Sequence, residues 1–419
     1  MHRRKCGEGS SEESIGSAKD NSHAGGNGMA NYLIIGNGVA GTTAAEAIRK
    51  LDNAGKITMV TEESSSFYYR MRLPDFIAGD LSEDKLSAKK DQWYKEQGID
   101  LKLNTRIQGA DPGKRVVTTH SGSAIPYDRL LLATGSRSFI PPMKGADKKG
   151  VFALRTLKDA KDIVAWAKGI QKVVLIGGGL LGLEAGNALR KLGKSLTVVE
   201  FFPRLLPRQL DVAGGGRLQK IMEGMEFSFR LGAKTQEIKG DDRVSGVLLE
   251  GGELLLAEMV IVSAGVRPSL ELAKALNLEC DKGVKVDEQM RTNQPGIYAA
   301  GDVAEFKGIP YGIWTAATEQ GQIAGTNIAG GNVLYKGTVM ANTLKVVGID
   351  LASAGNIDAE NKLESKVITD EKGYKKIVLE NDQIAGCIML GDTKGFIKIT
   401  KFMAEKQNVA QIKDKLFSE

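Results

Sequence analysis

The chain has 419 residues, of which 42% are hydrophobic and 26% are charged, and its formal net charge at pH 7 is +6. This length allows two or three domains, and the composition is that of an ordinary globular protein, without the roughly 18 to 20 consecutive apolar residues of a membrane-spanning helix. The positive balance is weak and no aromatic and basic binding pattern accompanies it, so we expect no nucleic-acid partner.

Residues 1–28 are rich in Gly, Ser and charged residues and poor in aliphatic residues. Such a segment cannot bury enough apolar surface to fold, so we predict a disordered extension. It lacks the apolar core of a secretory signal, and Met29 is a candidate for the natural start of the chain. The three cysteines are scattered without a C-x-x-C pair, which favours a reducing compartment. We therefore expect a cytoplasmic protein.

A glycine-rich turn joins the first predicted strand to the first predicted helix in the stretch NYLIIGNGVAGTTAAEAIRK. In G-x-G-x-x-G, the first glycine permits a sharp turn, the second lets a pyrophosphate approach, and the third lets the helix pack on the strand. The N–H groups at the start of the helix then face the phosphates. The residues of this predicted site are Gly36, Gly38, Val39, Ala40 and Gly41.

A second strand, KITMVTEE, follows this helix and ends in Glu62 and Glu63. A carboxylate at this place accepts hydrogen bonds from a ribose diol. Further along, GKRVVTTHSGSAIPYDRLLLATGSRSFIP contains alternating β-type runs and then an aliphatic strand that ends in Thr134 and Gly135.

The same order of elements occurs a second time. The stretch KVVLIGGGLLGLEAGNALRKL has the same glycine spacing, SLTVVE ends in an acid, and an aliphatic strand ends in VSAG. Two complete fingerprints predict two dinucleotide sites, and a carboxylate after the second strand favours NADH over NADPH because it repels a 2′-phosphate. The residues of the second predicted site are Gly177, Gly179, Leu180, Leu181, Gly182, Glu200 and Gly265.

The repeated pattern predicts an α/β fold with two Rossmann-like domains of three-layer ββα architecture. A further strand, in GIYAAGDVAEF, ends in Asp302, whose carboxylate suits either a ligand hydroxyl or the cap of the next turn. The predicted domains are 29–144 with 269–330, then 145–268, and finally a small α+β domain at 331–419.

Together, these motifs resemble the pyridine nucleotide-disulfide oxidoreductase class I family of two-dinucleotide-binding-domain flavoproteins. The resemblance implies tightly but non-covalently bound FAD at the first fingerprint, with Asp302 at the ribityl chain and Glu62 or Glu63 at the adenosine ribose. It implies that Thr134 and Gly135 lie beside the FAD. The second fingerprint would bind NADH as co-substrate, and Glu184 would hold the nicotinamide carboxamide. A surface glutamate is the alternative for Glu184.

The stretch FYYRMRLPDFIAGD resembles a segment of NADH–rubredoxin reductases and of the flavoprotein module of NADH-dependent nitrite reductases. This resemblance implies that Arg70 contacts FAD phosphate or adenine. Relatives that reduce [2Fe–2S] ferredoxins usually have Leu-Ser-Lys soon after this arginine. Here the chain has Leu73-Pro74-Asp75, so the salt bridge that such a lysine forms is not expected.

The cysteine positions separate the reaction classes of the family. The helix after the first fingerprint lacks the C-x₄-C pair that disulfide reductases of this family carry. The YYRMRLPDFIAGD region has no cysteine either. Cys280 and Cys387 are predicted to be packing residues. We therefore expect hydride transfer from NADH to flavin N5 without a redox-active cysteine, and electron delivery to a small acidic electron-carrier protein of the rubredoxin type. The alternatives are an NADH oxidase that reduces O₂ and a regulatory, apoptosis-factor-like flavoprotein.

The last 90 or so residues show β-type runs joined by polar turns and then a predicted helix over TKGFIKITKFMAEKQNVAQIKDKLF. The stretch NTLKVVGIDLASAGNID resembles the C-terminal domain of rubredoxin reductases. We predict that this interface domain packs against the FAD-binding domain and either dimerises or lies near the acceptor entrance. The protein is expected to be a monomer or a homodimer.

Overall fold

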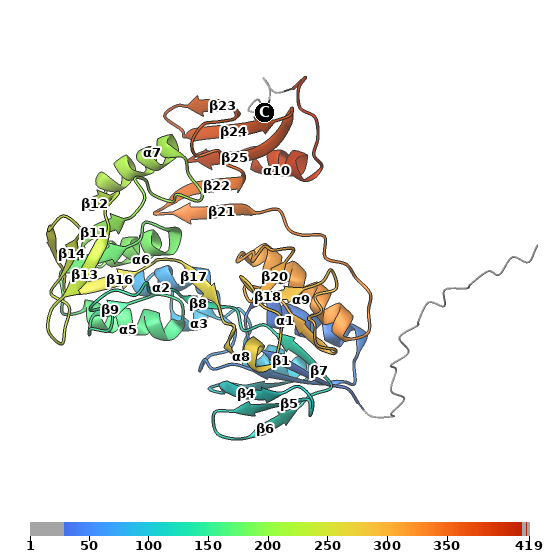
Figure 1. Cartoon of the computed structure of the whole chain (residues 1–419). Coiled ribbons are helices and arrows are strands. Elements are labelled where there is room, and N and C mark those ends of the chain that lie inside the picture. The colour runs from blue at the N-terminus through green and yellow to red at the C-terminus, as the bar shows by residue number, and fades with distance from the viewer. Residues whose placement is uncertain (1–28, 413–415, 417–419) are drawn as a thin grey trace, which may run out of the picture.

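The computed structural model describes residues 29–412 and residue 416. The predicted extension 1–28 lies outside the described residues, and so does Cys6. Within them the chain forms three units. In Figure 1 the first is coloured blue to teal and again yellow to orange, because the chain returns to it, the second is green to yellow, and the third is orange to red. No helix in this part of the chain combines the length and the apolar character that a bilayer crossing needs.

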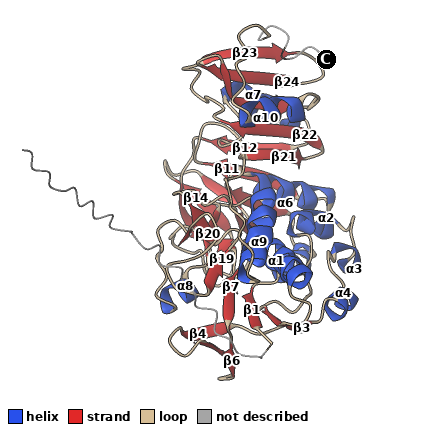
Figure 2. Ribbon diagram, turned by 90° about the vertical axis from the view of Figure 1, so that its right-hand side faces the viewer, coloured by secondary structure: helices blue, strands red, loops and turns tan. Residues whose placement is uncertain are grey.

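The first unit is built on a parallel sheet of five strands in the order β19-β7-β1-β2-β3. Its apolar residues alternate between the two faces: Ile34 belongs to the cluster under the helices, whereas Leu33 and Ile35 belong to the cluster on the opposite face. The helices α1 and α9 lie side by side on the first face (Figure 2). The sheet strands are β1 (Asn31–Ile35), β2 (Lys56–Val60), β3 (Ile99–Lys102), β7 (Arg129–Leu132) and β19 (Ile297–Ala299), and the helices are α1 (Val39–Leu51) and α9 (Trp314–Ile328).

A three-stranded antiparallel sheet covers the second face and completes three layers. Its strands are β4 (Ile107–Asp111), β5 (Val116–Thr119) and β6 (Ala124–Pro126). The peripheral elements of this unit are α4 (Asp91–Glu96), α8 (Glu271–Ala275), β18 (Val284–Val286) and β20 (Ala304–Phe306).

The second unit repeats this plan with a parallel sheet in the order β12-β11-β10-β16-β9 and an antiparallel sheet on one face. Both predicted Rossmann-like domains and their three layers are therefore confirmed. The parallel strands are β9 (Val151–Phe152), β10 (Lys172–Ile176), β11 (Ser195–Glu200), β12 (Phe227–Leu231) and β16 (Met259–Val262). The other elements are β13 (Thr235–Lys239), β14 (Gly246–Leu249), β15 (Leu254–Leu256), α5 (Leu157–Ala167), α6 (Leu180–Lys191) and α7 (Val212–Glu223).

Two connections tie these units together. The short strands β8 (Ser136–Ser138) and β17 (Val266–Pro268) pair antiparallel where the chain passes between the units. The segment around η1 (Arg70–Arg72), α2 (Leu73–Ala78) and α3 (Glu83–Leu86) departs from the first unit, and its Leu73 and Ile77 pack in the core of the second.

The third unit is an antiparallel sheet in the order β21-β22-β25-β24-β23 with one helix on it. The elements are β21 (Ala341–Val346), β22 (Ile349–Gly355), β23 (Glu364–Thr369), β24 (Tyr374–Glu380), β25 (Gln383–Leu390) and α10 (Phe396–Ala404). The predicted long helix is wrong for residues 405–412, since α10 ends at Ala404. There the backbone turns through Lys406 at φ +50°, and Val409 donates its N–H to the carbonyl of Asp382 and is buried.

The predicted packing of the third unit on the FAD-binding domain is also wrong. Val346, Val347, Leu351 and Tyr374 share one apolar cluster with α6 and α7 of the second unit. In Figure 1 the orange-to-red unit accordingly stands beside α6 and α7. Burial of these side chains, which local patterns do not reveal, determines the packing partner.

Candidate functional site

A cavity of about 2140 Å³ lies where the three units meet. Most of the predicted residues of the first site line it, together with the helical part of the second site: Gly36, Gly38, Val39, Ala40, Glu62, Glu63, Arg70, Thr134, Gly135, Asp302, Leu180, Leu181 and Glu184. The residues Gly41, Gly177, Gly179, Gly182, Glu200 and Gly265 lie outside this lining. The cavity therefore extends from the first glycine-rich loop to the first turns of α6, the helix that follows the second loop.

The three glycines of the first loop have three different constraints. Gly36 has φ +122°, and a Cβ there would lie 2.0 Å from the carbonyl oxygen of Ala133. A Cβ on Gly41 would lie 2.1 Å from the oxygen of Gly36, so this glycine permits the close helix–strand contact. A Cβ on Gly38 would meet no protein atom within 4 Å. Gly38 therefore leaves open the space through which a ligand approaches the backbone.

The second loop repeats this division. Gly177 has φ +109° and its Cβ would lie 2.3 Å from the oxygen of Ser263, whereas a Cβ on Gly182 would meet Ser263 and Gly177 within 3 Å. Gly179 is again the open position, with its nearest neighbour at 4.0 Å. Gly135 and Gly265, at the ends of equivalent strands, both have positive φ. The predicted equivalence of the two halves holds at each of these positions.

Several features at the first loop suit an anion such as a pyrophosphate. Helix α1 has Gly38 as its N-cap residue, without a side-chain cap and without an acid in the first turn, so its first N–H groups lack side-chain acceptors. Asn37 is 8% exposed; its Oδ1 accepts the hydroxyl of Tyr94 at 2.8 Å, but its Nδ2 has no partner among the described residues. A buried amide donor without an acceptor is costly, and a phosphate oxygen in the cavity would satisfy it.

The acid at the ribose end differs between the two halves. Gly36 donates its N–H to Val60, as Gly177 does to Val199, so Thr61 occupies the place of Glu200. Glu62 and Glu63 follow one and two positions later. Glu62 is exposed at the cavity, whereas the carboxylate of Glu63 is bonded to Tyr68 and Arg70. Glu62 is therefore the carboxylate left available to a ligand.

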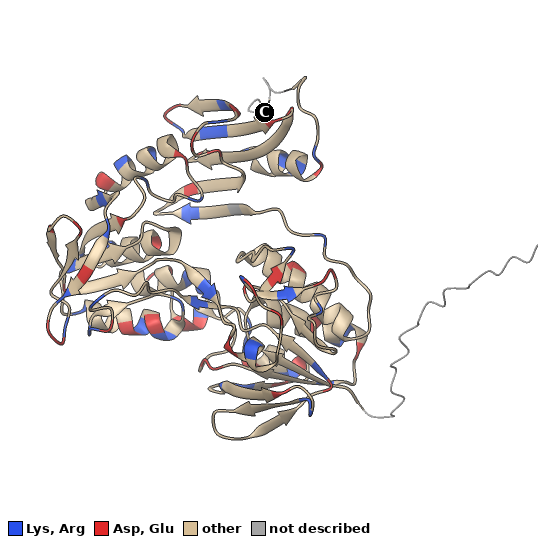
Figure 3. Cartoon of the chain, viewed as in Figure 1, with Lys and Arg blue, Asp and Glu red and all other residues tan. Residues whose placement is uncertain are grey.

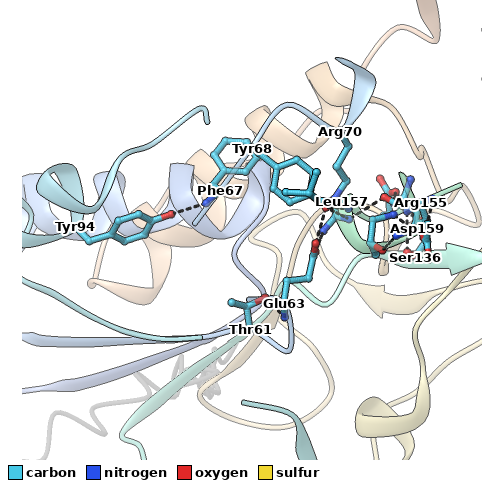
Figure 4. Close-up of polar contacts among 12 residues, drawn as sticks. Thr61, Glu63, Phe67, Tyr68, Arg70, Tyr94, Ser136, Arg155, Leu157 and Asp159 are labelled. Atoms are coloured by element: carbon cyan, nitrogen blue, oxygen red, sulfur yellow. Dashed lines mark hydrogen bonds and ion pairs between the residues drawn. The ribbon is translucent and has the colours of Figure 1, made fainter. Parts of the chain in front are cut away.

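Arg70 lies at the cavity wall and is held on several sides (Figure 4). It forms an ion pair with Glu63, and its Nη1 donates to the carbonyl of Arg155 at 3.0 Å and to the hydroxyl of Tyr68 at 3.3 Å. Burial raises the pKa of Tyr68, whose hydroxyl also accepts the N–H of Leu157. These contacts position the guanidinium but also neutralise part of its charge.

Arg155, which the sequence patterns did not single out, joins the two units at Asp302. Its Nη2 lies 2.9 Å from Asp302 Oδ2 and 2.7 Å from Ser136 Oγ, and Ser136 itself donates to Asp302 at 2.7 Å. The sequence feature that could have identified Arg155 is its position directly before the capping box of α5, which Thr156 and Asp159 form. Asp302 is thus oriented at the cavity by a neighbouring cation.

Glu200 ends β11 as predicted, and its side chain is 6% exposed. It accepts the N–H of Gly178 at 2.5 Å and the N–H of Phe202 at 2.8 Å, so it braces the glycine-rich loop and the loop that follows. In the loop after β11, Arg204 donates to the carbonyls of Pro207 and Leu210.

Glu184 projects from α6 into the cavity. Its Oε1 accepts the N–H of Val347, in the third unit, at 2.6 Å. Burial raises the pKa of its carboxyl, the Val347 N–H opposes this rise, and the charge of nearby Asp75 adds to it. Asp75, in the place where the ferredoxin-reducing relatives have a lysine, forms its ion pair with Arg72 at 2.9 Å.

The cysteines of the described chain do not line the cavity. Cys387 is buried in β25, and burial raises its pKa to about 12. Burial also raises the pKa of Cys280, which lies in the first unit. By contrast, Trp314 at the cavity stacks on both Phe67 and Tyr69, with ring centroids at 5.9 and 5.8 Å.

A family model described as pyridine nucleotide-disulphide oxidoreductase matches residues 30–322, and a model described as the rubredoxin NAD+ reductase C-terminal domain matches residues 341–407. Nitrite reductase [NAD(P)H] of Bacillus subtilis is 36% identical over 92% of this chain and 48% of its own length. NADH-rubredoxin oxidoreductase of Clostridium acetobutylicum is 34% identical over 88% of this chain and 93% of its own.

The chain spans about half the length of the nitrite and nitrate reductase relatives that it matches. Among solved structures, the crystal structure of NADH:rubredoxin oxidoreductase from Clostridium acetobutylicum superposes with a TM-score of 0.79 at 30% identity. That match covers 92% of this chain and 98% of the other. The likeness therefore extends through all three units.

Proposed function

Because the chain belongs to the pyridine nucleotide-disulphide oxidoreductase family, we propose that it is an FAD-dependent NADH oxidoreductase that delivers electrons to a small redox protein. The single observation that carries this proposal is the cavity itself. It brings the first glycine-rich loop, Asp302 and Glu184 to one space, although these residues come from two separate nucleotide-binding units.

The first loop is the proposed FAD site. Gly38 leaves the approach open, the first turn of α1 offers N–H groups, and Asn37 offers a buried amide donor without an acceptor. Asp302, oriented by Arg155 and Ser136, would accept a ribityl hydroxyl. Glu62 would accept the adenosine ribose hydroxyls. Arg70 would attract the phosphates with the part of its positive charge that the ion pair with Glu63 does not neutralise.

The second loop is the proposed NADH site. Gly179 leaves the approach to the α6 N-terminus open, and this helix also has no side-chain cap and no acid in its first turn. Glu200 would bind the ribose diol and repel a 2′-phosphate, which favours NADH. Leu180 and Leu181 lie between this loop and the cavity, where Glu184 would accept the carboxamide of the nicotinamide.

When bound, the flavin would supply the redox chemistry, as acceptor of a hydride from NADH and as donor of two single electrons to the carrier, with NAD⁺ and a proton as the other products. The residues of this chain bind both dinucleotides, orient them and carry the charges around them. No described cysteine lines the cavity, so the proposed route contains no thiol step.

The proposed acceptor is a small acidic electron-carrier protein of the rubredoxin type, and the relative from Clostridium acetobutylicum is named an NADH-rubredoxin oxidoreductase. At the cavity, α10 presents Ile397, 84% exposed, and Lys401. Lys394 and Lys398 are also exposed and line a neighbouring pocket together with Ile397 and Lys401, and Figure 3 shows blue, basic positions on α10. An apolar centre with basic neighbours is complementary to an acidic carrier. Trp314 and Phe67, which stack on each other, line the same cavity.

The experiment that tests this function is anaerobic. The flavin-loaded protein is reduced with NADH and then offered rubredoxin, a [2Fe–2S] ferredoxin and a quinone in turn. We expect rubredoxin to reoxidise the flavin fastest. In a separate assay under air without a carrier, rapid NADH consumption would instead identify an oxidase. Slow flavin reduction with a long-lived charge-transfer band would identify a regulatory flavoprotein.

A further inference from the structure

The hairpin between β21 and β22 reaches from the third unit to the cavity end of α6. Its tip consists of Val347 and Gly348, because Val346 and Ile349 form the last pair of the ladder. Glu184 accepts the N–H of Val347 there, and Gly348 lines the cavity beside it. A main-chain donor of the third unit therefore holds the side chain proposed to meet the nicotinamide.

The geometry of this tip is unusual for its sequence. Val347 has φ +46° and Gly348 has φ +89°, as in the two-residue turns that usually contain Asn-Gly. A β-branched residue rarely adopts a positive φ. Val347 is only 4% exposed and packs in the apolar cluster shared with α6, so tertiary packing keeps the strained turn in place.

A second polar bridge fixes the same sheet to the second unit. The hydroxyl of Tyr374 donates to Asp211 Oδ2 at 2.6 Å, and Lys376 Nζ lies 3.3 Å from the same oxygen. Asp211 caps α7 and ends the loop that follows Glu200. The third unit is thus anchored to the second unit at two places, Glu184 of α6 and the N-cap of α7.

The charges around Glu184 make the Val347 contact important. Asp75 of α2 repels its carboxylate, whereas Lys191 of α6 attracts it but is bonded to Asp80 at 2.7 Å. Within residues 29–412, the Val347 N–H is the one hydrogen-bond donor to Glu184, and it uses Oε1. Oε2 accepts no hydrogen bond from these residues and remains available to a ligand.

We propose that the hairpin tip Val347–Gly348 is a positioning element of the NADH site, which holds Oε1 of Glu184 so that Oε2 receives the carboxamide N–H of the nicotinamide. This inference rests on the proposed NADH-dependent function. It assigns the third unit to nicotinamide positioning, in addition to any contact with the acceptor. The adenosine end of NADH, bound at Gly179 and Glu200, does not depend on the tip.

The test inserts one glycine between Val347 and Gly348, which displaces the N–H from Glu184. The matched control inserts one glycine between Asn381 and Asp382, a two-residue turn of the same sheet with similar positive φ values. We expect the first insertion to slow flavin reduction at saturating NADH about tenfold or more, since small misplacements of a positioning group are costly. ADP-ribose, which lacks the nicotinamide, should bind with unchanged affinity, and the control should match the unmodified protein in both measurements.

Reduction of the first insertion variant at the unmodified rate would overturn the inference. A parallel loss of ADP-ribose affinity would also overturn it, because that result indicates general damage to the unit. If the unmodified protein is not reduced by NADH, the proposed function fails, and with it the nicotinamide role of the tip.

A second measurement tests the hydrogen bond between Val347 and Glu184 directly, even if an insertion variant does not fold. Amide hydrogen exchange at residues 346–348 should become faster in Glu184→Ala and stay slow in Glu184→Gln, which retains an acceptor. Equal protection of the Val347 amide in the Ala variant and in the unmodified protein would refute the link directly.

Discussion

Lys376 Nζ lies 3.3 Å from Asp211 Oδ2, and both side chains are almost completely buried between the second and third units, at 0% and 2% exposure. Lys376 also donates to the carbonyl of Asp358 and to Asn361, so each of its hydrogen bonds has a definite acceptor. A pair of this kind is costly to break from one side, because the remaining charge stays buried without its partner.

Lys376→Met should therefore destabilise the protein by about 3 kcal/mol, since Asp211 keeps only the Tyr374 hydroxyl and the Gly214 N–H. The measurement is the shift in the urea unfolding midpoint of the flavin-loaded protein. Lys372→Met, an exposed lysine of the same unit, is the control and should change the midpoint little. Equal effects of the two substitutions would contradict the importance of the buried pair.

Gly38→Ala should remove flavin without harming the fold, because its Cβ meets no protein atom within 4 Å but enters the space where the pyrophosphate must lie. We expect the flavin content of the purified protein to fall at least about tenfold, with an apoprotein melting temperature unchanged from that of unmodified apoprotein. Gly36→Ala, whose Cβ would collide with Ala133, should lower that temperature as well. Full flavin occupancy in Gly38→Ala would rule out the assigned position.

Asn37→Asp should also weaken flavin binding, since it replaces the unpartnered Nδ2 donor with a negative oxygen near the phosphates. The retained Oδ1 can still accept the Tyr94 hydroxyl, so the fold should survive. Isothermal titration of the apoprotein with FAD measures the loss, which we expect to be about tenfold or more. Tyr94→Phe, which removes the hydroxyl that Asn37 Oδ1 accepts, is the control and should reduce the FAD affinity much less.

The coenzyme preference should depend on the charge of Glu200. We expect kcat/KM for NADH to exceed that for NADPH by at least about tenfold, and Glu200→Gln to narrow this ratio by removing the repulsion of the 2′-phosphate. The amide oxygen of Gln still accepts one of the two backbone N–H groups that Glu200 now holds. An unchanged ratio in the Gln variant would place the discrimination elsewhere.

Glu184 should make stability depend on pH in a definite direction. Burial raises the pKa of its carboxyl in the folded protein, so the folded state favours the protonated form and ionisation reduces stability. This cost is absent at acid pH, where both states are protonated, and is complete above the raised pKa. Glu184→Gln should therefore melt higher than the unmodified protein at neutral pH and equally at acid pH.

Glu380→Gln, at an exposed glutamate of the third unit, is the matched control and should show no such crossover. A Glu184→Gln effect that is constant from acid to neutral pH would mean that packing, and not ionisation, determines the difference.

The sequence predicted what depends on local spacing. The roles of Gly36, Gly38 and Gly41 follow from residue type and order alone, and the positions of a hypothetical Cβ agree with each. The ends of β1, β7, β10, β16 and β19 could be located equally well, because each aliphatic run stops one to three residues before a glycine. The carboxylate after β2 was harder to assign, because the letters TEE do not reveal which of Thr61, Glu62 and Glu63 aligns with Glu200. Backbone hydrogen bonds between the strands show that Thr61 aligns with it.

Contacts between distant segments could not be predicted. Arg155 and Asp302 are 147 positions apart, and Glu184 and Val347 are 163 apart, so no periodicity connects either pair. The third unit was assigned to the wrong partner for the same reason: the burial of Tyr374 and Val347 against the second unit has no local signature.

The proposed function requires that one cavity brings NADH to a bound flavin without a thiol between them. Rapid anaerobic mixing of the flavin-loaded protein with NADH tests it most directly, with Cys280→Ser/Cys387→Ser measured in parallel. We expect single-phase bleaching of the flavin band at the same rate in both proteins. Absence of bleaching, or its loss in the protein without the two cysteines despite an unchanged flavin content, would contradict it.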